Sequence, residues 1–180
     1  MSKKNLVLIG FMGTGKSSVG KALAKRTGRA LIDVDQRIEE KEKRRIADIF
    51  EKDGEVAFRR LEKDAIREAA KSSGAIITTG GGAVIDPENL SILKVGGVLV
   101  ALEASPETIF QRVKDSRHRP LLHSNDVPAE IRRLLEARRP YYQKADLTFV
   151  TDGKSAAQVA EEIAAKLASS EEFEFGKDWF

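Results

Sequence analysis

One glycine-rich segment constrains this chain more than any other feature. Residues 10–17 read Gly-Phe-Met-Gly-Thr-Gly-Lys-Ser and directly follow the apolar run at residues 6–9. This is the spacing of a P-loop, in which a buried strand turns into a helix. Because glycines carry no side chain, the backbone N–H groups can close around a polyphosphate, and the helix N-terminus adds partial positive charge. The segment therefore predicts that the chain binds a nucleoside triphosphate.

The residues of this segment have distinct expected roles. We expect Lys16 to reach the β- and γ-phosphates and the Ser17 hydroxyl to coordinate Mg²⁺. The other residues expected to bind ATP in this loop are Gly13, Thr14, Gly15 and Ser18. A glycine-rich turn with an incidental lysine is the plainer alternative. A dinucleotide fingerprint is disfavoured, because Ser18 stands where that motif needs glycine or alanine and the Gly-Lys-Ser triplet has no place in it.

Composition argues against several other classes of protein. The chain has 180 residues, a formal net charge of +3 and no cysteine, which rules out disulfides, thiolate metal sites and cysteine nucleophiles. No apolar run is long enough to span a bilayer, and the N-terminus lacks a signal peptide's apolar core, so we expect a cytoplasmic protein without membrane contacts. The slight basic excess fits a cleft for an anionic small substrate, and no RNA- or DNA-binding motif is present.

Apolar runs alternate with helical patterns along the chain. The apolar runs that predict strands are residues 5–10, 30–35, 75–79, 97–103 and 147–150. The expected helices are 15–26, 36–72 with an interruption at 53–54, one starting at Asp86, one capped by Ser105, 129–144 with an interruption at Pro140, and 155–167. Because strands that are apolar throughout are typical of a sheet covered on both faces, we expect a three-layer α/β/α fold with five parallel strands. Residues 1–168 are assigned to one domain.

Two acids end the second expected strand. Residues two apart on a strand project to the same side, so Asp33 and Asp35 would both point outward at the carboxyl end of the sheet, where open α/β sheets bind ligands. Near a P-loop, such carboxylates can hold Mg²⁺ through water and accept the proton of an attacking hydroxyl. The plainer alternative is a helix N-cap beside a solvent-facing acid, since a helical pattern begins at Gln36.

An arginine and a run of glycines are candidates for binding a second substrate. Arg59 and Glu62 lie three residues apart on an expected helix. They form either a surface ion pair or an arginine that is oriented to bind a carboxylate with two nitrogens. Three glycines at residues 80–82 follow the third strand, where they either bring the backbone close to a ligand or serve a tight turn.

Two segments lack a regular pattern. Residues 114–126 are polar and basic, and we interpret them as a mobile lid. An arginine carried by such a lid, Arg117 or Arg119, would be able to stabilise a transferring phosphoryl group, although basic loops are commonly just solvated. Residues 169–180 carry acids and aromatic residues without a period. The sequence leaves open whether this tail is disordered or docks onto the core.

Taken together, these motifs resemble the shikimate kinase family. The resemblance covers roughly residues 5–168. It rests on the P-loop, Asp33-Val34-Asp35, Phe58-Arg59-x-x-Glu62, Gly80-Gly81-Gly82-Ala83, Arg119-Pro120-Leu121-Leu122 and Arg138-x-Pro140-x-Tyr142. It implies a P-loop kinase fold with a lid, and ATP-dependent phosphorylation of the shikimate 3-hydroxyl in aromatic amino-acid biosynthesis. The implied products are shikimate 3-phosphate and ADP, and we expect the enzyme to be a monomer.

The resemblance also implies roles for the residues that match the family on the acceptor side. Arg59 and Arg138 would bind the carboxylate of shikimate. Asp35 would bind its hydroxyls, and Gly81 would contribute backbone. The catalytic residues implied by the resemblance are Lys16, Asp35 and Arg119.

On the nucleotide side, the resemblance implies that Ser17 and Asp33 serve Mg²⁺. Arg112 would lie against adenine. Lys154 falls near a position where the family often has a basic residue beside adenine. The residues expected to contact the transferring phosphoryl group are Lys16 and Arg119.

Three other functions compete with this interpretation. A gluconate-type kinase is also a small P-loop enzyme for a hydroxylated carboxylate, but the Arg59–Glu62 pair and the Arg138 motif argue against it. A nucleotide-dependent switch that transfers no phosphate is weakly supported, since no Asn-Lys-x-Asp guanine-reading segment is present. A nucleic-acid-dependent ATPase would bind RNA or DNA with a steep salt dependence, which we do not expect.

Overall fold

A computed structural model describes residues 4–114 and 126–170 of the chain. Within these ranges, five parallel strands form one sheet in the order β2-β3-β1-β4-β5. The strands are β1 (Asn5–Ile9), β2 (Leu31–Asp33), β3 (Ile76–Thr78), β4 (Gly97–Glu103) and β5 (Leu147–Val150). The helices are α1 (Lys16–Thr27), α2 (Val34–Glu42), α3 (Ile46–Ala70), α4 (Pro87–Gly96), α5 (Pro106–Val113), α6 (Val127–Tyr142) and α7 (Ala156–Ala168), with a 3₁₀ turn η1 (Ala83–Ile85). The expected α/β fold with five parallel strands is confirmed.

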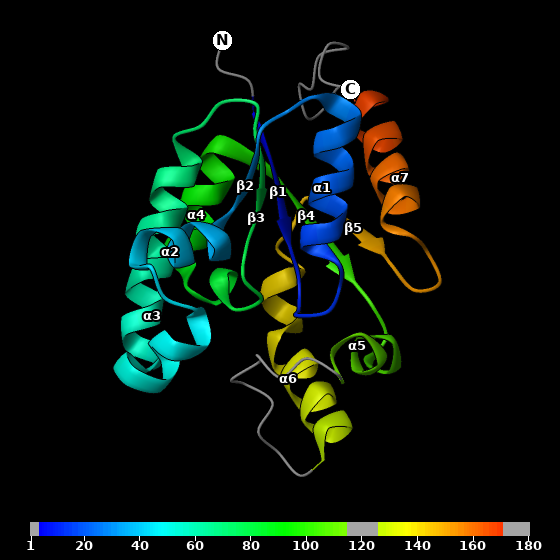
Figure 1. Ribbon diagram of the computed structural model, residues 1–180. Helices are drawn as coiled ribbons and strands as arrows, with labels where there is room; N and C mark the ends of the chain where they lie inside the picture. Colours follow the sequence, from blue (N-terminus) through cyan, green and yellow to red (C-terminus); the bar gives the residue numbers. More distant parts are fainter. Residues whose placement is uncertain (1–3, 115–125, 171–180) are drawn as a thin grey trace.

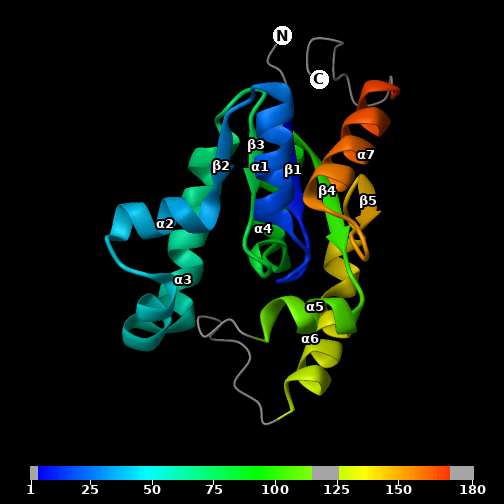
Figure 2. The same cartoon turned by 45° about the vertical axis from the view of Figure 1, so that its right-hand side comes forward.

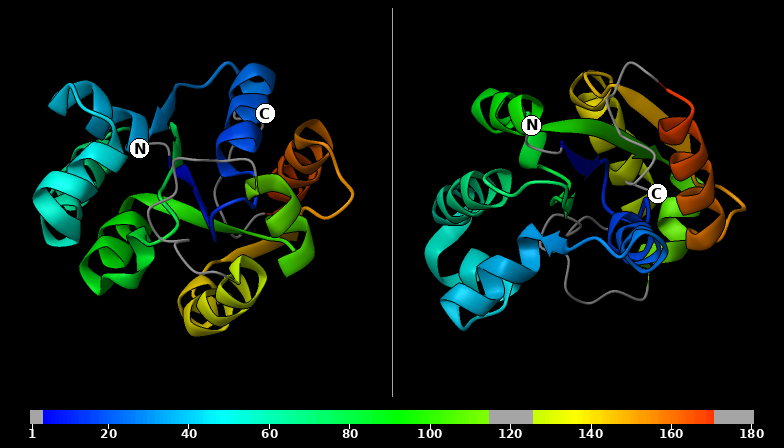
Figure 3. Two further views of the ribbon diagram at one scale, coloured as in Figure 1. Left: turned by 60° about the horizontal axis from the view of Figure 1, so that its bottom comes forward. Right: turned by 90° about the horizontal axis from the view of Figure 1, so that it is seen from above.

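Helices cover both faces of the sheet, and the central strand shows why. Successive side chains of β1 point to opposite faces. Leu6 and Leu8 pack in the apolar cluster beneath α1 and α7, whereas Val7 and Ile9 pack in the cluster beneath α3, α4 and α6. All four side chains are fully buried, as an uninterrupted apolar run predicts. Figures 1 and 3 show α1 and α7 side by side on one face, with α3, α4 and α6 across the sheet.

Polar side chains cap the first turns of the helices that begin at the carboxyl edge of the sheet. The Asp33 carboxylate caps α2 by accepting a hydrogen bond from Gln36 N at 3.1 Å. Asp86 and Ser105 cap α4 and α5 in the same manner, each followed by a proline, and Ser155 forms a capping box with Gln158. Such caps satisfy backbone N–H groups that have no partner inside the helix. Figure 2 shows α2 and α3 on one side of the carboxyl ends of the strands and α5 and α6 below them.

Three expected boundaries are wrong and one is confirmed. The second strand ends at Asp33, not Asp35, because the chain turns into α2 immediately after it. Pro140 does not interrupt α6, which continues to Tyr142. The helical pattern expected over residues 36–72 is also broken at residues 43–45, since α2 ends at Glu42 and α3 begins at Ile46. The expected break near residue 54 is confirmed, since Gly54 adopts φ 82° inside α3, a conformation that glycine tolerates at little cost.

The lid expected at residues 114–126 and the tail at 169–180 fall almost wholly outside the described ranges. Within the described part of the chain, no helix has the length and apolar character needed to cross a membrane.

Candidate functional site

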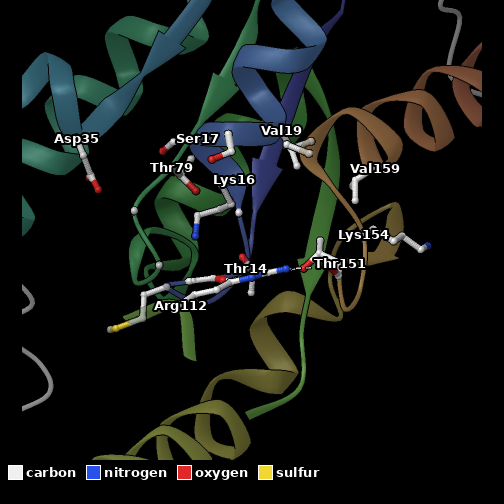
Figure 4. Close-up of a pocket in the computed structure, with 17 residues that line it drawn as sticks. Thr14, Lys16, Ser17, Val19, Asp35, Thr79, Arg112, Thr151, Lys154 and Val159 are labelled. Atoms are coloured by element: carbon white, nitrogen blue, oxygen red, sulfur yellow. Dashed lines mark hydrogen bonds between the residues drawn. The ribbon is translucent and has the colours of Figure 1, made fainter. Parts of the chain in front are cut away.

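The largest cluster of expected site residues surrounds one cavity at the carboxyl edge of the sheet. Its volume is about 530 Å³. Its lining includes Gly13, Thr14, Gly15, Lys16, Ser17, Ser18, Asp35, Gly81, Arg112 and Lys154. Figure 4 shows Asp35 at one end of this cavity and Lys154 at the other, with Lys16 between them. The tertiary structure thus gathers residues that are up to 141 positions apart in the sequence, counted from Gly13 to Lys154.

The P-loop is held closed by its own backbone and by Lys16. Gly10 adopts φ 138°, and a Cβ atom on it would lie 2.3 Å from the carbonyl oxygen of Leu102, so only glycine fits there. The Lys16 ammonium donates to the carbonyl oxygens of Gly10 and Phe11, both at 2.8 Å. The lysine is 8% exposed. The ammonium therefore lies inside the loop, in the position from which it can reach a phosphate.

Ser17 and Asp33 lie next to each other, as a shared metal site requires. The Ser17 hydroxyl donates to Asp33 Oδ2 at 3.0 Å, and Thr78 donates to the same oxygen at 2.9 Å. Hydroxyl and carboxylate oxygens are the ligands that Mg²⁺ prefers, usually together with water and phosphate oxygens. No group of three or more acidic or histidine side chains in the described residues forms a metal cage. These two residues fit a magnesium ion that is held mainly by a bound nucleotide.

Asp35 does not lie on the strand with Asp33, contrary to expectation. It belongs to the first turn of α2, yet its carboxylate still lines the cavity. Burial raises the pKa of Asp35 to about 7, and the negative charges of Glu62 and Asp33 act in the same direction, while Lys16 opposes them. Its Oδ1 atom is buried without a hydrogen-bond partner in the protein. The alternative of a solvent-facing acid is therefore wrong, and the group is suited to accept a proton near neutral pH.

Arg59 and Glu62 form a partly buried pair on α3. Arg59 Nη1 donates to Glu62 Oε2 at 2.8 Å, and Nη2 donates to Glu55 at 3.0 Å. Glu62 is only 1% exposed, and burial raises its pKa although Arg59 opposes this effect. The interpretation as a simple surface ion pair does not hold for Glu62. Its carboxylate holds the guanidinium of Arg59 in a fixed orientation.

Arg138 lies on α6 and is also buried, with 8% of its surface exposed. Its guanidinium lies 5.5 Å from the centre of the Phe11 ring, and its Nη1 atom has no hydrogen-bond partner in the protein. The positive charge of Arg138 acts on the buried carboxyl of Glu62 and, like that of Arg59, opposes the rise in its pKa. The cations of α3 and α6 therefore both act on one buried acid, Glu62.

The three glycines after β3 bring backbone between these charged groups. A Cβ atom on Gly80 would lie 2.9 Å from both Asp35 Oδ1 and Glu62 Oε1, and one on Gly82 would lie 2.6 Å from Arg59 Nη2. The close approach of backbone to functional side chains thus requires residues without side chains. The carbonyl oxygen of Gly81 accepts a hydrogen bond from the Tyr142 hydroxyl at 2.6 Å. Sequence reasoning assigned no role to this tyrosine, although its position four residues after Arg138 was a signal.

Lys154 borders the end of the cavity opposite Asp35, and Arg112 lines the cavity beside Gly13 and Thr151. Arg112 donates to the carbonyl oxygen of Gly13 at 3.1 Å and to the hydroxyl and carbonyl oxygens of Thr151, each at 3.0 Å. These bonds hold the edge of the guanidinium, as Figure 4 shows. Lys154 pairs with Glu162 on α7 at 2.7 Å. Thr151 is a further site residue that sequence reasoning missed. Arg119 lies outside the described residues.

Comparisons with known proteins all indicate one family. The sequence model of the shikimate kinase family matches residues 12–168. The chain is 49% identical to the shikimate kinase of Geobacter sulfurreducens over 89% of each chain. It is 44% identical to that of Caldanaerobacter subterraneus over 89% of this chain and 94% of the relative. A solved structure of shikimate kinase from Acinetobacter baumannii in complex with shikimate superimposes with a TM-score of 0.89, at 36% identity over 92% of this chain and 93% of the other. The chain belongs to the shikimate kinase family.

Proposed function

We propose that this protein transfers the γ-phosphoryl group of ATP to the 3-hydroxyl of shikimate, forming shikimate 3-phosphate and ADP. The observation that supports this most directly is that the P-loop and Asp35 line one cavity, while Glu62, whose charge acts on Asp35, is itself acted on by the half-buried Arg59 and the buried Arg138. Shikimate is a small carboxylate with several hydroxyl groups. A site for it needs arginines for the carboxylate, an acid for the hydroxyls and close backbone, and these are the groups present.

The acceptor is held by Arg59 and Arg138 in this proposal. Both guanidiniums bind the substrate carboxylate, while Glu62 keeps Arg59 oriented through the 2.8 Å bond. The backbone of Gly81 lies against the ring of shikimate. The buried Nη1 atom of Arg138, which has no protein partner, gains one when the carboxylate binds.

Asp35 orients the attacking hydroxyl and takes its proton. Its pKa near 7 allows the carboxylate form to exist at neutral pH and still be basic enough to accept a proton. Lys16 moves from the carbonyl oxygens of the P-loop to the phosphates and stabilises charge on the transferring group. Arg119 would add a second positive charge there. Catalysis then consists mainly of positioning and charge stabilisation.

Mg²⁺ bound with ATP would be held by Ser17 and, through water, by Asp33. Its chemistry there is to neutralise charge on the phosphate oxygens. Arg112 offers a guanidinium face to adenine while its edge stays bonded to Gly13 and Thr151. Lys154 lines the same cavity. That the protein is a monomer and acts in the cytoplasm stays a prediction. Size-exclusion chromatography tests whether it is a monomer.

A coupled assay of ADP release tests the proposal. The purified protein is incubated with MgATP and either shikimate, gluconate or a nucleoside monophosphate. We expect release only with shikimate, and a product that carries phosphate on the 3-hydroxyl by NMR. ADP release with another acceptor and none above background with shikimate would refute the assignment. Tighter ATP binding with shikimate but no transfer would instead indicate a switch.

A further inference from the structure

The side chain of Tyr142 reaches from α6 to the glycine loop, residues 80–82, of which Gly80 and Gly81 line the cavity. It is the last residue of α6 and only 4% exposed. Its hydroxyl donates to the carbonyl oxygen of Gly81, 61 residues away, at 2.6 Å. The chain has only two tyrosines, and the other, Tyr141, is half-buried with its ring against the Lys144 ammonium. Tyr142 is therefore the one whose phenol contacts a residue of the site.

The Gly81 peptide needs an external anchor. The neighbouring carbonyl oxygens of Gly80 and Gly82 accept bonds from Ala83 and Ile85 within the turn. Gly81 lies between glycines, and a peptide unit between glycines rotates with little steric resistance. The bond from Tyr142 sets the direction of its carbonyl group. Because the peptide unit is planar and trans, the N–H group of the following glycine then points the opposite way.

Arg138 lies on the same helix as the Tyr142 phenol. The two residues are four positions apart on α6, which places them on one side of the helix. Burial raises the pKa of Tyr142 to about 12, and the positive charge of Arg138 opposes that rise. The phenol thus stays protonated at neutral pH. It can accept from the guanidinium and donate to Gly81 at the same time, which phenylalanine cannot do.

We propose that Tyr142 is a positioning residue for the carboxylate of the acceptor: its phenol holds the Gly81 peptide and lies on the same side of α6 as Arg138, so that the cation and the backbone keep one geometry. This inference rests on the proposed function. It differs from a core-filling role, which the ring of Tyr142 performs as part of the apolar cluster around Phe11 and which phenylalanine would retain.

The Tyr142→Phe variant separates the two roles. We expect the KM for shikimate to rise roughly tenfold, the usual consequence of losing a buried hydrogen bond to a charged or backbone group. We expect kcat at saturating shikimate and the KM for ATP to stay within about twofold of wild type, because the P-loop is untouched. Tyr141→Phe is the matched control and should match wild type in all three parameters.

A second substrate makes the test specific to the carboxylate. The methyl ester of shikimate lacks the negative charge that Arg138 and the Gly81 peptide position in this proposal. Tyr142→Phe and wild type should therefore phosphorylate the ester with equal kcat/KM. An unchanged KM for shikimate in Tyr142→Phe would overturn the inference, whether or not the melting temperature falls. An equal loss for shikimate and its ester would overturn it too, because it indicates general damage to the fold.

If Tyr142→Phe does not fold, fluorine NMR tests the inference with the phenol still in place. In the Tyr141→Phe background, 3-fluorotyrosine labels Tyr142 alone. We expect its fluorine resonance to shift when shikimate is added without nucleotide and to stay in place when ADP is added alone. No shift with shikimate would overturn the inference. If wild type releases no ADP with shikimate, the proposed function fails; if it does and Tyr142→Phe behaves identically, only the role of Tyr142 fails.

Discussion

The two halves of the site differ in how their buried polar groups are satisfied. In the donor half, around Lys16, Ser17 and Arg112, each of these side chains is hydrogen-bonded within the protein. In the acceptor half, around Asp35, Glu62 and Arg138, each side chain has one buried polar atom without a protein partner. Among the residues that the structure describes, only one other buried side-chain atom is in this position, Asn89 Oδ1.

This difference shows what each half does when a ligand binds. An unpaired buried polar atom costs about 1–3 kcal/mol, and folds retain such atoms mainly where function needs them. The acceptor half can therefore gain new bonds from the carboxylate and hydroxyls of a substrate. The donor half must exchange bonds, because Lys16 leaves two carbonyl oxygens to reach a phosphate. We expect substitutions to divide along the same line, with ATP parameters changing in one half and shikimate parameters in the other.

The largest effect is expected for Lys16→Ala in the donor half. Loss of the ammonium should reduce phosphoryl transfer by about 10³-fold or more, since it removes charge stabilisation of the transferring group. Shikimate binding, measured by calorimetry, should remain within about threefold of wild type. Lys21→Ala, an exposed position on the same helix, is the control. Loss of shikimate binding in Lys16→Ala would contradict the division into two halves.

Asp35→Asn tests the acid of the acceptor half that lines the same cavity as the P-loop. Removing the proton acceptor should lower kcat by about 10²–10³-fold. Burial and the charge of Glu62 disfavour the Asp35 carboxylate, so above pH 7 the neutral amide should leave the melting temperature unchanged or raise it by about 2–4 °C, the equivalent of ~1 kcal/mol. Thermal denaturation at pH 8 checks this sign, with Glu40→Gln on α2 as the control. A lower melting temperature would show that the buried carboxylate stabilises the fold.

Arg59→Ala tests the acceptor half. We expect the KM for shikimate to rise by about 10²-fold through loss of a bidentate carboxylate contact, with the KM for ATP unchanged. The variant also leaves Glu62 buried without its partner, which should lower the free energy of unfolding by about 1–3 kcal/mol.

Two further variants separate binding from stability at this position. Adding Glu62→Gln to Arg59→Ala should restore part of the stability without restoring the KM. Arg60→Ala, an exposed neighbour, should behave as wild type. An unchanged KM for shikimate in Arg59→Ala would remove this arginine from the site.

The smallest effect is expected for Arg112→Ala. Its guanidinium bonds to Gly13 and Thr151, not to a residue of the acceptor half, so the KM for ATP should rise by about five- to tenfold while the KM for shikimate stays constant. Steady-state kinetics with each substrate varied in turn measures both. Gln111→Ala, exposed on the same helix, is the control. A larger change for shikimate than for ATP would show that the two halves are coupled through the P-loop.

Much of the fold follows from local signals in the sequence. The fourth and fifth strands have the expected bounds, residues 97–103 and 147–150, because each is a short apolar run between turn and cap residues. Asp86 and Ser105 act as N-caps before prolines, as expected. Asp35 could not be placed in this way. Both a strand end and a first helical turn fit Asp33-Val34-Asp35, and the Asp33 carboxylate decides between them by capping α2 and binding Ser17 and Thr78.

A P-loop, alternating strands and helices, and charged residues suited to a phosphoryl donor and a carboxylate acceptor could all be recognised from the amino-acid sequence. The tertiary structure was needed to show that Glu62 is buried, that Asp35 enters the cavity from a helix, and that the Tyr142 hydroxyl bonds to Gly81. The physical reason is distance along the chain. Caps and strand periodicity act between near neighbours, whereas burial, the pKa of Asp35 and the Tyr142 bond depend on segments brought together by the sheet.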